Sequence, residues 1–175
     1  MKFTKLAAAM TLALAVCAAQ AATDTFNVTL TVTGTCDGAA FTANTTSDVA
    51  FGTVTASGSN AALQATNSAD TALSVACSKG TVATIGLTPS NASTTGAGSM
   101  SNGTDTIAYQ LRQPTAAYAP AYTTNWGNTG AGLFSVTGTG LATPIAVPVQ
   151  ATVAANTLDV PAGAYTDAVT ATLSY

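Results

Sequence analysis

The chain has 175 residues, four of them basic and seven acidic, and it contains no histidine and no glutamate. This composition excludes catalysis by a nucleophile with a histidine base, and it excludes metal sites with histidine ligands. The chain has no basic patch, so nucleic acid is a poor partner. Two aspartates brought together by folding remain an acid–base alternative. The candidates are scattered along the chain: Asp24, Asp37, Asp48, Asp70, Asp105, Asp159 and Asp167.

Residues 1–21 have the features of a signal peptide. Two lysines precede an apolar run, 6–16, which is too short to span a bilayer, and Ala19-Gln20-Ala21 has the small residues of a signal-peptidase site. We therefore expect the chain to be exported and cut directly after this triplet. Lipid attachment at Cys17 is the alternative, but the residue before such a cysteine is normally small and here it is Val16.

Residues 25–33 alternate strictly between apolar and polar side chains, and they begin close to the expected cleavage point. Such alternation places the apolar set on one face of an extended strand. The strand ends just before Cys36. Its apolar members are Phe26, Val28, Leu30 and Val32.

Two cysteines, Cys36 and Cys77, remain after removal of the expected signal peptide. In an exported chain, two cysteines most simply form one disulfide. Two free buried thiols are the alternative.

The rest of the chain predicts an all-β domain. Short β-rich runs alternate with loops rich in Gly, Asn, Ser and Thr, a pattern typical of a β-sandwich. The expected strands cover residues 48–55, 72–77, 81–88, 105–112, 133–137, 144–153 and 164–175. The second and third of these are expected to form a hairpin, whereas 56–70, 89–104 and 114–132 are expected to be loops. In the last run, one face holds Val169, Ala171, Leu173 and Tyr175.

The loop 114–132 contains three aromatic residues, Tyr118, Tyr122 and Trp126. Aromatic rings stack on sugars, so one hypothesis is a carbohydrate platform. The more ordinary interpretation is that the rings pack over the rim of the sandwich.

Several motifs in order resemble the spore coat protein U domain family, which includes subunits of archaic chaperone–usher pili. The resemblance covers the whole mature chain. Its most specific parts are "YQL" followed by "NWG", and the closing "AG-Y-D-V---L-Y" pattern. The motifs are "GTC" at 34–36, "AFG" at 50–52, "SVAC" and "SKG" within 74–80, Met100, "IAYQL" at 107–111, "NWG" at 125–127 and "PAGAYTDAVTATLSY" at 161–175.

This resemblance implies an incomplete immunoglobulin-like β-sandwich that lacks its final strand. Residues 22–35 would be a donor segment, and residues 36–175 would form the sandwich. The alternating apolar residues of the donor segment would fill a hydrophobic groove in the next subunit. That groove would lie between the strand around residues 73–77, or its neighbours, and the last strand, whose apolar face runs from Val169 to Tyr175. The family also places a disulfide at the base of the donor segment, which matches Cys36 with Cys77.

The resemblance further implies a structural pilus subunit, not an enzyme, with no cofactor and no metal. Its partners would be a periplasmic chaperone, an outer-membrane usher and neighbouring pilin subunits. The chain would pass through the periplasm to the cell surface or the extracellular space, where it would serve attachment or biofilm formation. Two alternatives stay open. One is a secreted coat protein that does not polymerise, in which residues 25–33 pair within their own chain. The other is a carbohydrate-binding adhesin.

Overall fold

The computed structural model describes residues 27–37, 48–67, 73–116 and 121–175. The chain divides into residues 1–32 and 33–175, and every strand found in the described ranges belongs to the second part. The expected signal peptide lies outside the described residues, as does Phe26. Within the described ranges, no helix is long and apolar enough to cross a membrane.

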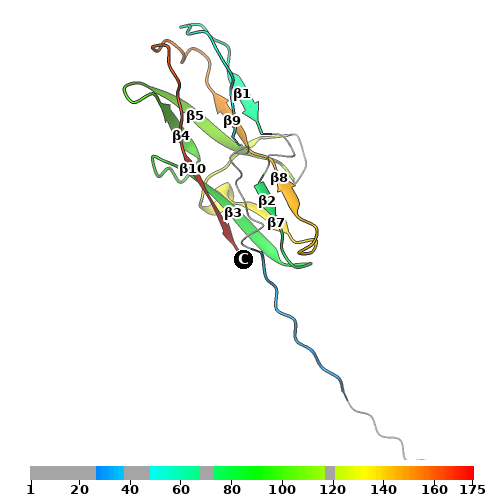
Figure 1. Cartoon of the computed structure of the whole chain (residues 1–175). Helices are drawn as coiled ribbons and strands as arrows, with labels where there is room; N and C mark the ends of the chain where they lie inside the picture. Colours follow the sequence, from blue (N-terminus) through cyan, green and yellow to red (C-terminus); the bar gives the residue numbers. More distant parts are fainter. Residues whose placement is uncertain (1–26, 38–47, 68–72, 117–120) are drawn as a thin grey trace, which may run out of the picture. The chain divides into compact units, whose positions relative to one another are not determined.

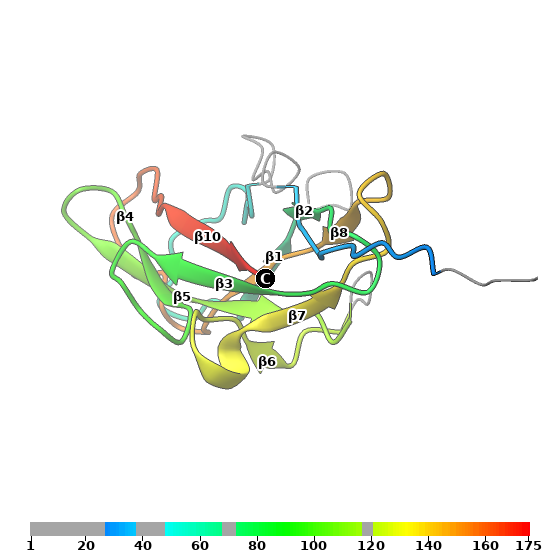
Figure 2. The same cartoon turned by 90° about the horizontal axis from the view of Figure 1, so that it is seen from below.

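The strands of the described residues form three sheets in which every pair is antiparallel. Figures 1 and 2 show them from two directions. The five-stranded sheet contains β1 (Leu63–Thr66), β9 (Gln150–Val153), β5 (Thr106–Gln113), β4 (Ala97–Ser101) and β6 (Thr124–Asn125). The three-stranded sheet has the order β10 (Val169–Ser174), β3 (Val82–Pro89), β7 (Phe134–Thr137), and the remaining pair is β2 (Leu73–Val75) with β8 (Ile145–Val147). The expected all-β class is therefore confirmed.

Alternation along the strands places one set of side chains in a common core. In β5, Ile107, Tyr109 and Leu111 are buried, as their shared face predicted. β3 buries Ala83, Ile85 and Leu87 in the same way. Strands of all three sheets contribute to this one hydrophobic cluster, because each sheet has an apolar face that water would otherwise contact.

The expected run 144–153 is divided into two strands that belong to different sheets. β8 pairs with β2, whereas β9 pairs with β1 and β5. Pro148 stands between them, and proline has no N–H to donate to a sheet. Side chains nevertheless alternate without interruption across the division. The buried positions are Ile145, Val147, Val149, Ala151 and Val153.

The expected hairpin of 72–77 with 81–88 is wrong. β2 pairs with β8, and β3 pairs with β10 and β7. Gly138 holds the connection between β2 and β3, because its N–H donates to Thr81 O over 2.8 Å and its carbonyl accepts from Gly80 N over 2.9 Å. The turn residues 78–80 predicted a hairpin. Contacts with distant residues instead place β2 and β3 in different sheets.

Four further expectations differ from the structure. Residues 48–55 form no strand, while β1, β4 and β6 lie in segments expected to be loops. β4 contains Gly98, which is opposite Tyr109 in the β4–β5 register. A Cβ at Gly98 would overlap the ring of Tyr109. This glycine therefore indicates close packing against a ring, although in the sequence it resembles a loop residue.

Candidate functional site

The C-terminal strand has one unpaired edge within the part of the chain that the structure describes. β10 pairs with β3 from Val169 opposite Pro89 to Ser174 opposite Thr84, and no described strand pairs with its other side. Figure 1 shows β10 in dark red alongside β3. An unpaired edge presents free backbone N–H and C=O groups, which are a template for another strand.

The side chains of β10 are only partly covered. Ala171 and Leu173 are half-buried and pack against the core, while Val169 is 38% and Tyr175 66% exposed. None of the six residues of β10 is fully buried, whereas β3 buries five of its eight. The core is therefore less complete along β10, the strand whose apolar residues are predicted to border a groove, than along its partner β3.

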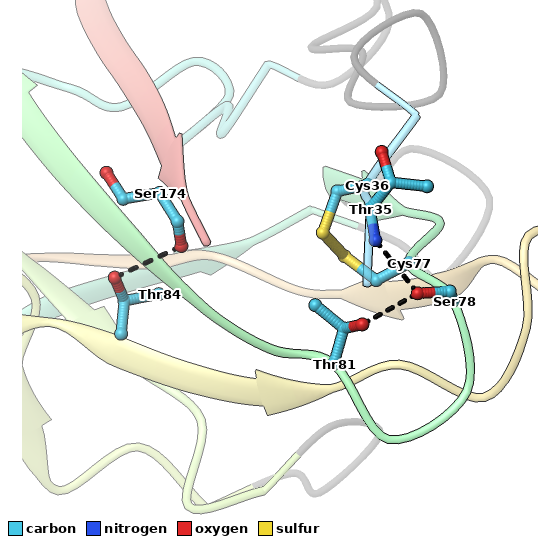
Figure 3. Close-up of a disulfide and its surroundings, with 7 residues drawn as sticks. All are labelled: Thr35, Cys36, Cys77, Ser78, Thr81, Thr84 and Ser174. Atoms are coloured by element: carbon cyan, nitrogen blue, oxygen red, sulfur yellow. Dashed lines mark hydrogen bonds between the residues drawn. A yellow bond between two sulfur atoms is a disulfide. The ribbon is translucent and has the colours of Figure 1, made fainter. Parts of the chain in front are cut away.

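Cys36 and Cys77 form the expected disulfide, with an S–S distance of 2.04 Å. The two residues also form an antiparallel bridge, in which Asp37 N donates to Ala76 O and Ser78 N donates to Thr35 O, both over 2.8 Å. The hydroxyl of Ser78 also accepts a hydrogen bond from Thr35 N, with a distance of 3.0 Å between the two atoms; Figure 3 draws this bond as a dashed line. The first residues of the domain are therefore fixed to the chain after β2 by a covalent bond and by hydrogen bonds.

This anchored segment lies at the same end of β3 as the end of β10. The Ser78 hydroxyl bonds that of Thr81 over 2.7 Å, and Thr81 directly precedes β3. Three residues further on, the Thr84 hydroxyl donates to Ser174 O over 3.5 Å (Figure 3). The start of β3 thus connects the disulfide with the C-terminal end of β10.

The predicted donor residues are exposed where the structure describes them. Val28, Leu30 and Val32 have exposed fractions of 87%, 87% and 80%. Residues 27–34 contain no strand, because a β-strand requires a partner for its backbone groups. Their use as a donor strand remains a prediction.

Trp126 does not form a carbohydrate platform. Its side chain is fully buried, its ring nitrogen donates to Ile85 O over 3.0 Å, and its ring centroid lies 5.5 Å from that of Phe134. Tyr122 is half-buried, and Tyr118 lies outside the described residues. Trp126 thus joins β3 to the loop 114–132 inside the core, which agrees with the interpretation that this loop packs on the sandwich.

We predict that Trp126→Ala lowers the free energy of unfolding by about 3–5 kcal/mol, because it empties a large buried site and leaves Ile85 O without its donor. Urea unfolding followed by far-UV circular dichroism measures this loss. Tyr122→Ala, in the same loop but half-buried, is the control and should lose less. An unchanged urea midpoint for Trp126→Ala would show that the indole is not part of the core.

The described residues offer little acid–base or metal chemistry. They contain no group of three or more His, Cys, Asp or Glu side chains that could hold a metal ion. A cavity of about 490 Å³ has only uncharged side chains around it. These are Thr94, Thr95, Thr123, Thr124, Asn125, Thr129, Ala131 and Gly132. Such a wall supplies hydroxyl and amide groups but no group that titrates near neutral pH.

The family model of the Spore Coat Protein U domain matches residues 22–172. No curated protein matches the chain.

Two similar solved structures come from complexes of fimbrial subunits. One is the CsuC–CsuE chaperone–tip adhesion subunit pre-assembly complex from archaic chaperone–usher Csu pili of Acinetobacter baumannii, with 20% identity and a TM-score of 0.46. The other is a chaperone–tip adhesin complex of CFA/I fimbriae, with 14% identity and a TM-score of 0.40. The alignments cover 83% and 66% of this chain but only 40% and 35% of the matched chains.

Proposed function

The chain belongs to the Spore Coat Protein U domain family, and from this membership we propose that it is a structural subunit of a chaperone–usher pilus. Subunits would join by donor-strand complementation, in which the N-terminal segment of one subunit adds a strand to the next. The observation that supports this proposal is the open edge of β10 with its half-buried apolar side chains. A strand added there would pair with free backbone groups and cover apolar surface at the same time.

The N-terminal segment has the pattern that such an edge requires. Its apolar residues stand at every second position from Phe26 to Val32, and those of the last strand stand at every second position from Val169 to Tyr175. Successive side chains of a strand point to opposite faces, so an alternating donor presents its whole apolar set to one groove. Exposure of 80–87% at Val28, Leu30 and Val32 leaves these side chains available to a neighbour.

The proposed partners follow from this incomplete fold. An unpaired edge beside apolar surface promotes aggregation, so a periplasmic chaperone would cover it before assembly. An outer-membrane usher would then exchange the chaperone for the next subunit. The finished fibre would stand on the cell surface and serve attachment or biofilm formation.

The proposal is tested by two matched variants of the N-terminal segment. One changes Val28, Leu30 and Val32 to serine, and the other changes Thr29, Thr31 and Thr33 to serine. We expect the first variant to abolish polymerisation because the groove receives no apolar side chains, and the second to polymerise normally. Each variant should change the free energy of unfolding of the monomer by less than about 0.5 kcal/mol, since exposed side chains contribute little to it.

Fibre formation is measured by light scattering and electron microscopy, and stability by urea unfolding. If the apolar variant polymerises like the wild type, the donor assignment is wrong. If instead its monomer is strongly destabilised, residues 25–33 pair within their own chain, as expected for a coat protein that does not polymerise.

A further inference from the structure

The strand β10 receives little support from buried side chains, yet the proposed function requires it to stay in place before a donor arrives. Its inner residues are half-buried and one edge is unpaired in the described structure. Hydrophobic burial scales with the area removed from water, so β10 gains less from the core than β3 or β5 do. Contacts other than hydrophobic burial must therefore position the first residues of β10.

The residue that meets this need is Asp167, two positions before β10. Its Oδ2 accepts a hydrogen bond from the Tyr109 hydroxyl over 2.6 Å, and its Oδ1 accepts one from Ala168 N over 2.9 Å. The Ser90 side chain and the Ser99 backbone also bond this carboxylate. One side chain therefore connects the start of β10 with β4, β5 and the turn that follows β3.

Tyr109 reaches Asp167 because Gly98 leaves room for its ring. The two residues are opposite each other in the β4–β5 register, and any side chain at position 98 would overlap the ring. Tyr109 lies in the five-stranded sheet, whereas β10 belongs to the three-stranded one. The hydrogen bond from Tyr109 to Asp167 therefore joins two sheets of the sandwich.

Neighbouring contacts fasten the same stretch of chain to the end of β4. Thr166 and Ser101 form a bridge with N–H···O distances of 2.9 and 3.1 Å. Next to it, Asn102 Nδ2 donates to the Tyr165 hydroxyl over 3.0 Å, and that hydroxyl donates to Pro161 O over 2.8 Å. Residues 165–167 thus form a docked segment from which β10 starts.

The charge states around Asp167 agree with this role. Burial raises the pKa of the carboxyl, but the hydrogen bonds from Ser90, Tyr109 and the two backbone amides outweigh it, so the pKa of Asp167 is lowered. Burial, and then the bond and the charge of Asp167, raise the pKa of Tyr109. Two other titratable groups lie here, Tyr165 and Asp105. Burial, and then the charge of Asp105, raise the pKa of Tyr165. A carboxylate and a neutral phenol therefore face each other at neutral pH.

We propose that Asp167 is a positioning residue that docks the start of the acceptor strand β10 to the five-stranded sheet through Tyr109. This inference rests on the proposed function for the identity of β10 as the acceptor. A carboxyl whose pKa is lower in the folded chain stabilises the fold above its unfolded pKa of about 4. That contribution is lost as the pH falls through the lower folded value, so acid should loosen the start of β10.

Amide hydrogen exchange of the full-length mature chain, kept monomeric in every sample by serine at Val28, Leu30 and Val32, tests the proposal. At neutral pH, Asp167→Asn should speed exchange in residues 169–174 by about tenfold, the effect of weakening one hydrogen-bonded charged group, and leave β5 near its wild-type rate. As the pH falls below about 4 and through the lower folded pKa of Asp167, the ratio of variant to wild-type rates should approach one, because the wild-type carboxyl becomes protonated. Asp159→Asn, which removes an exposed carboxyl elsewhere, is the matched control and should leave β10 unchanged.

Tyr109→Phe removes only the hydroxyl and keeps the ring over Gly98. It should also speed exchange in β10, and it decides the question if Asp167→Asn does not fold. The proposal is overturned if Tyr109→Phe and Asp167→Asn exchange in β10 like Asp159→Asn, or if exchange rises equally in every strand.

A second readout separates this inference from the proposed function. A synthetic peptide of residues 22–33 is added to each chain in the same serine background at Val28, Leu30 and Val32, which cannot polymerise, and the complex is counted by native mass spectrometry. The wild type and Asp159→Asn should bind the peptide, whereas Asp167→Asn should bind it several-fold less. If the wild type binds no peptide, the donor-strand proposal fails, while the exchange data still decide whether Asp167 positions β10. If wild type and Asp167→Asn bind the peptide equally, docking by Asp167 does not control the acceptor.

Discussion

Replacing Cys36 and Cys77 together by alanine should lower the free energy of unfolding by about 4 kcal/mol. The disulfide closes a loop with a sequence separation of 41 residues, and removing it frees that loop in the unfolded chain. Both cysteines are buried, with exposed fractions of 5% and 1%. Alanine is therefore the better substitute, because it buries no hydroxyl group. Urea unfolding followed by Trp126 fluorescence measures the loss.

Two controls separate the covalent bond from the contacts around it. The wild type, reduced while unfolded and then studied in reductant, should lose a similar free energy of unfolding. Ser78→Ala removes the hydroxyl that accepts from Thr35 N and bonds Thr81, and it should cost only about 1 kcal/mol. An alanine double variant as stable as the oxidised wild type would mean that bridge hydrogen bonds alone fix the base of the N-terminal segment.

The alternation of apolar and polar residues predicted the strands in which the local sequence alone decides which side chains are buried. β3, β5 and β7 lie within one or two residues of the expected runs. Their buried side chains are the apolar members of each pattern, such as Ile107, Tyr109 and Leu111, except for Gln113 at the end of β5. In these strands, local sequence and tertiary packing favour the same arrangement.

Elements determined by distant contacts could not be predicted in this way. β4 has the sequence AGSMS, which is poor in strand-forming residues, and Gly98 is needed only because a ring from β5 covers it. The turn 78–80 resembles a hairpin turn, but Gly138 and Cys36 bind its two ends. These partners lie dozens of residues away, so no local pattern indicates them.

The same distinction between local sequence and distant contacts applies to the candidate site. The cysteine pair and the apolar face of the last strand could be predicted, because composition and alternation suffice for both. The sequence favours packing of the loop aromatics on the sandwich, but the partners of Trp126 could not be predicted, since Ile85 O and Phe134 come from other parts of the chain. In the sequence, Asp167 is one of several scattered aspartates. Its hydrogen bond with the Tyr109 hydroxyl exists only in the folded chain.

Mixing two defective subunits should produce dimers and nothing larger. In the first, Val28, Leu30 and Val32 are serine, so it can accept a strand but cannot donate one. In the second, Leu173→Ser weakens the half-buried face of β10, so it can donate but not accept. Neither subunit should polymerise alone. In the mixture, the N-terminal segment of the second subunit fills the groove of the first. The resulting dimer cannot grow, because its remaining N-terminal segment and its remaining groove are both defective.

This result follows from the polarity of donor-strand assembly. A heterologous, head-to-tail contact lets wild-type subunits form an open fibre, whereas a symmetric exchange of two N-terminal segments would close wild-type subunits into dimers. Size-exclusion chromatography with light scattering distinguishes the two, because wild-type subunits should form long polymers and each defective subunit should elute as a monomer. Thr172→Ser, an exposed neighbour on the opposite face of β10, is the matched control for Leu173→Ser and should polymerise normally. Closed dimers in place of polymers from the wild type would contradict head-to-tail donation, and polymers in the mixture would show that Leu173 does not border the groove.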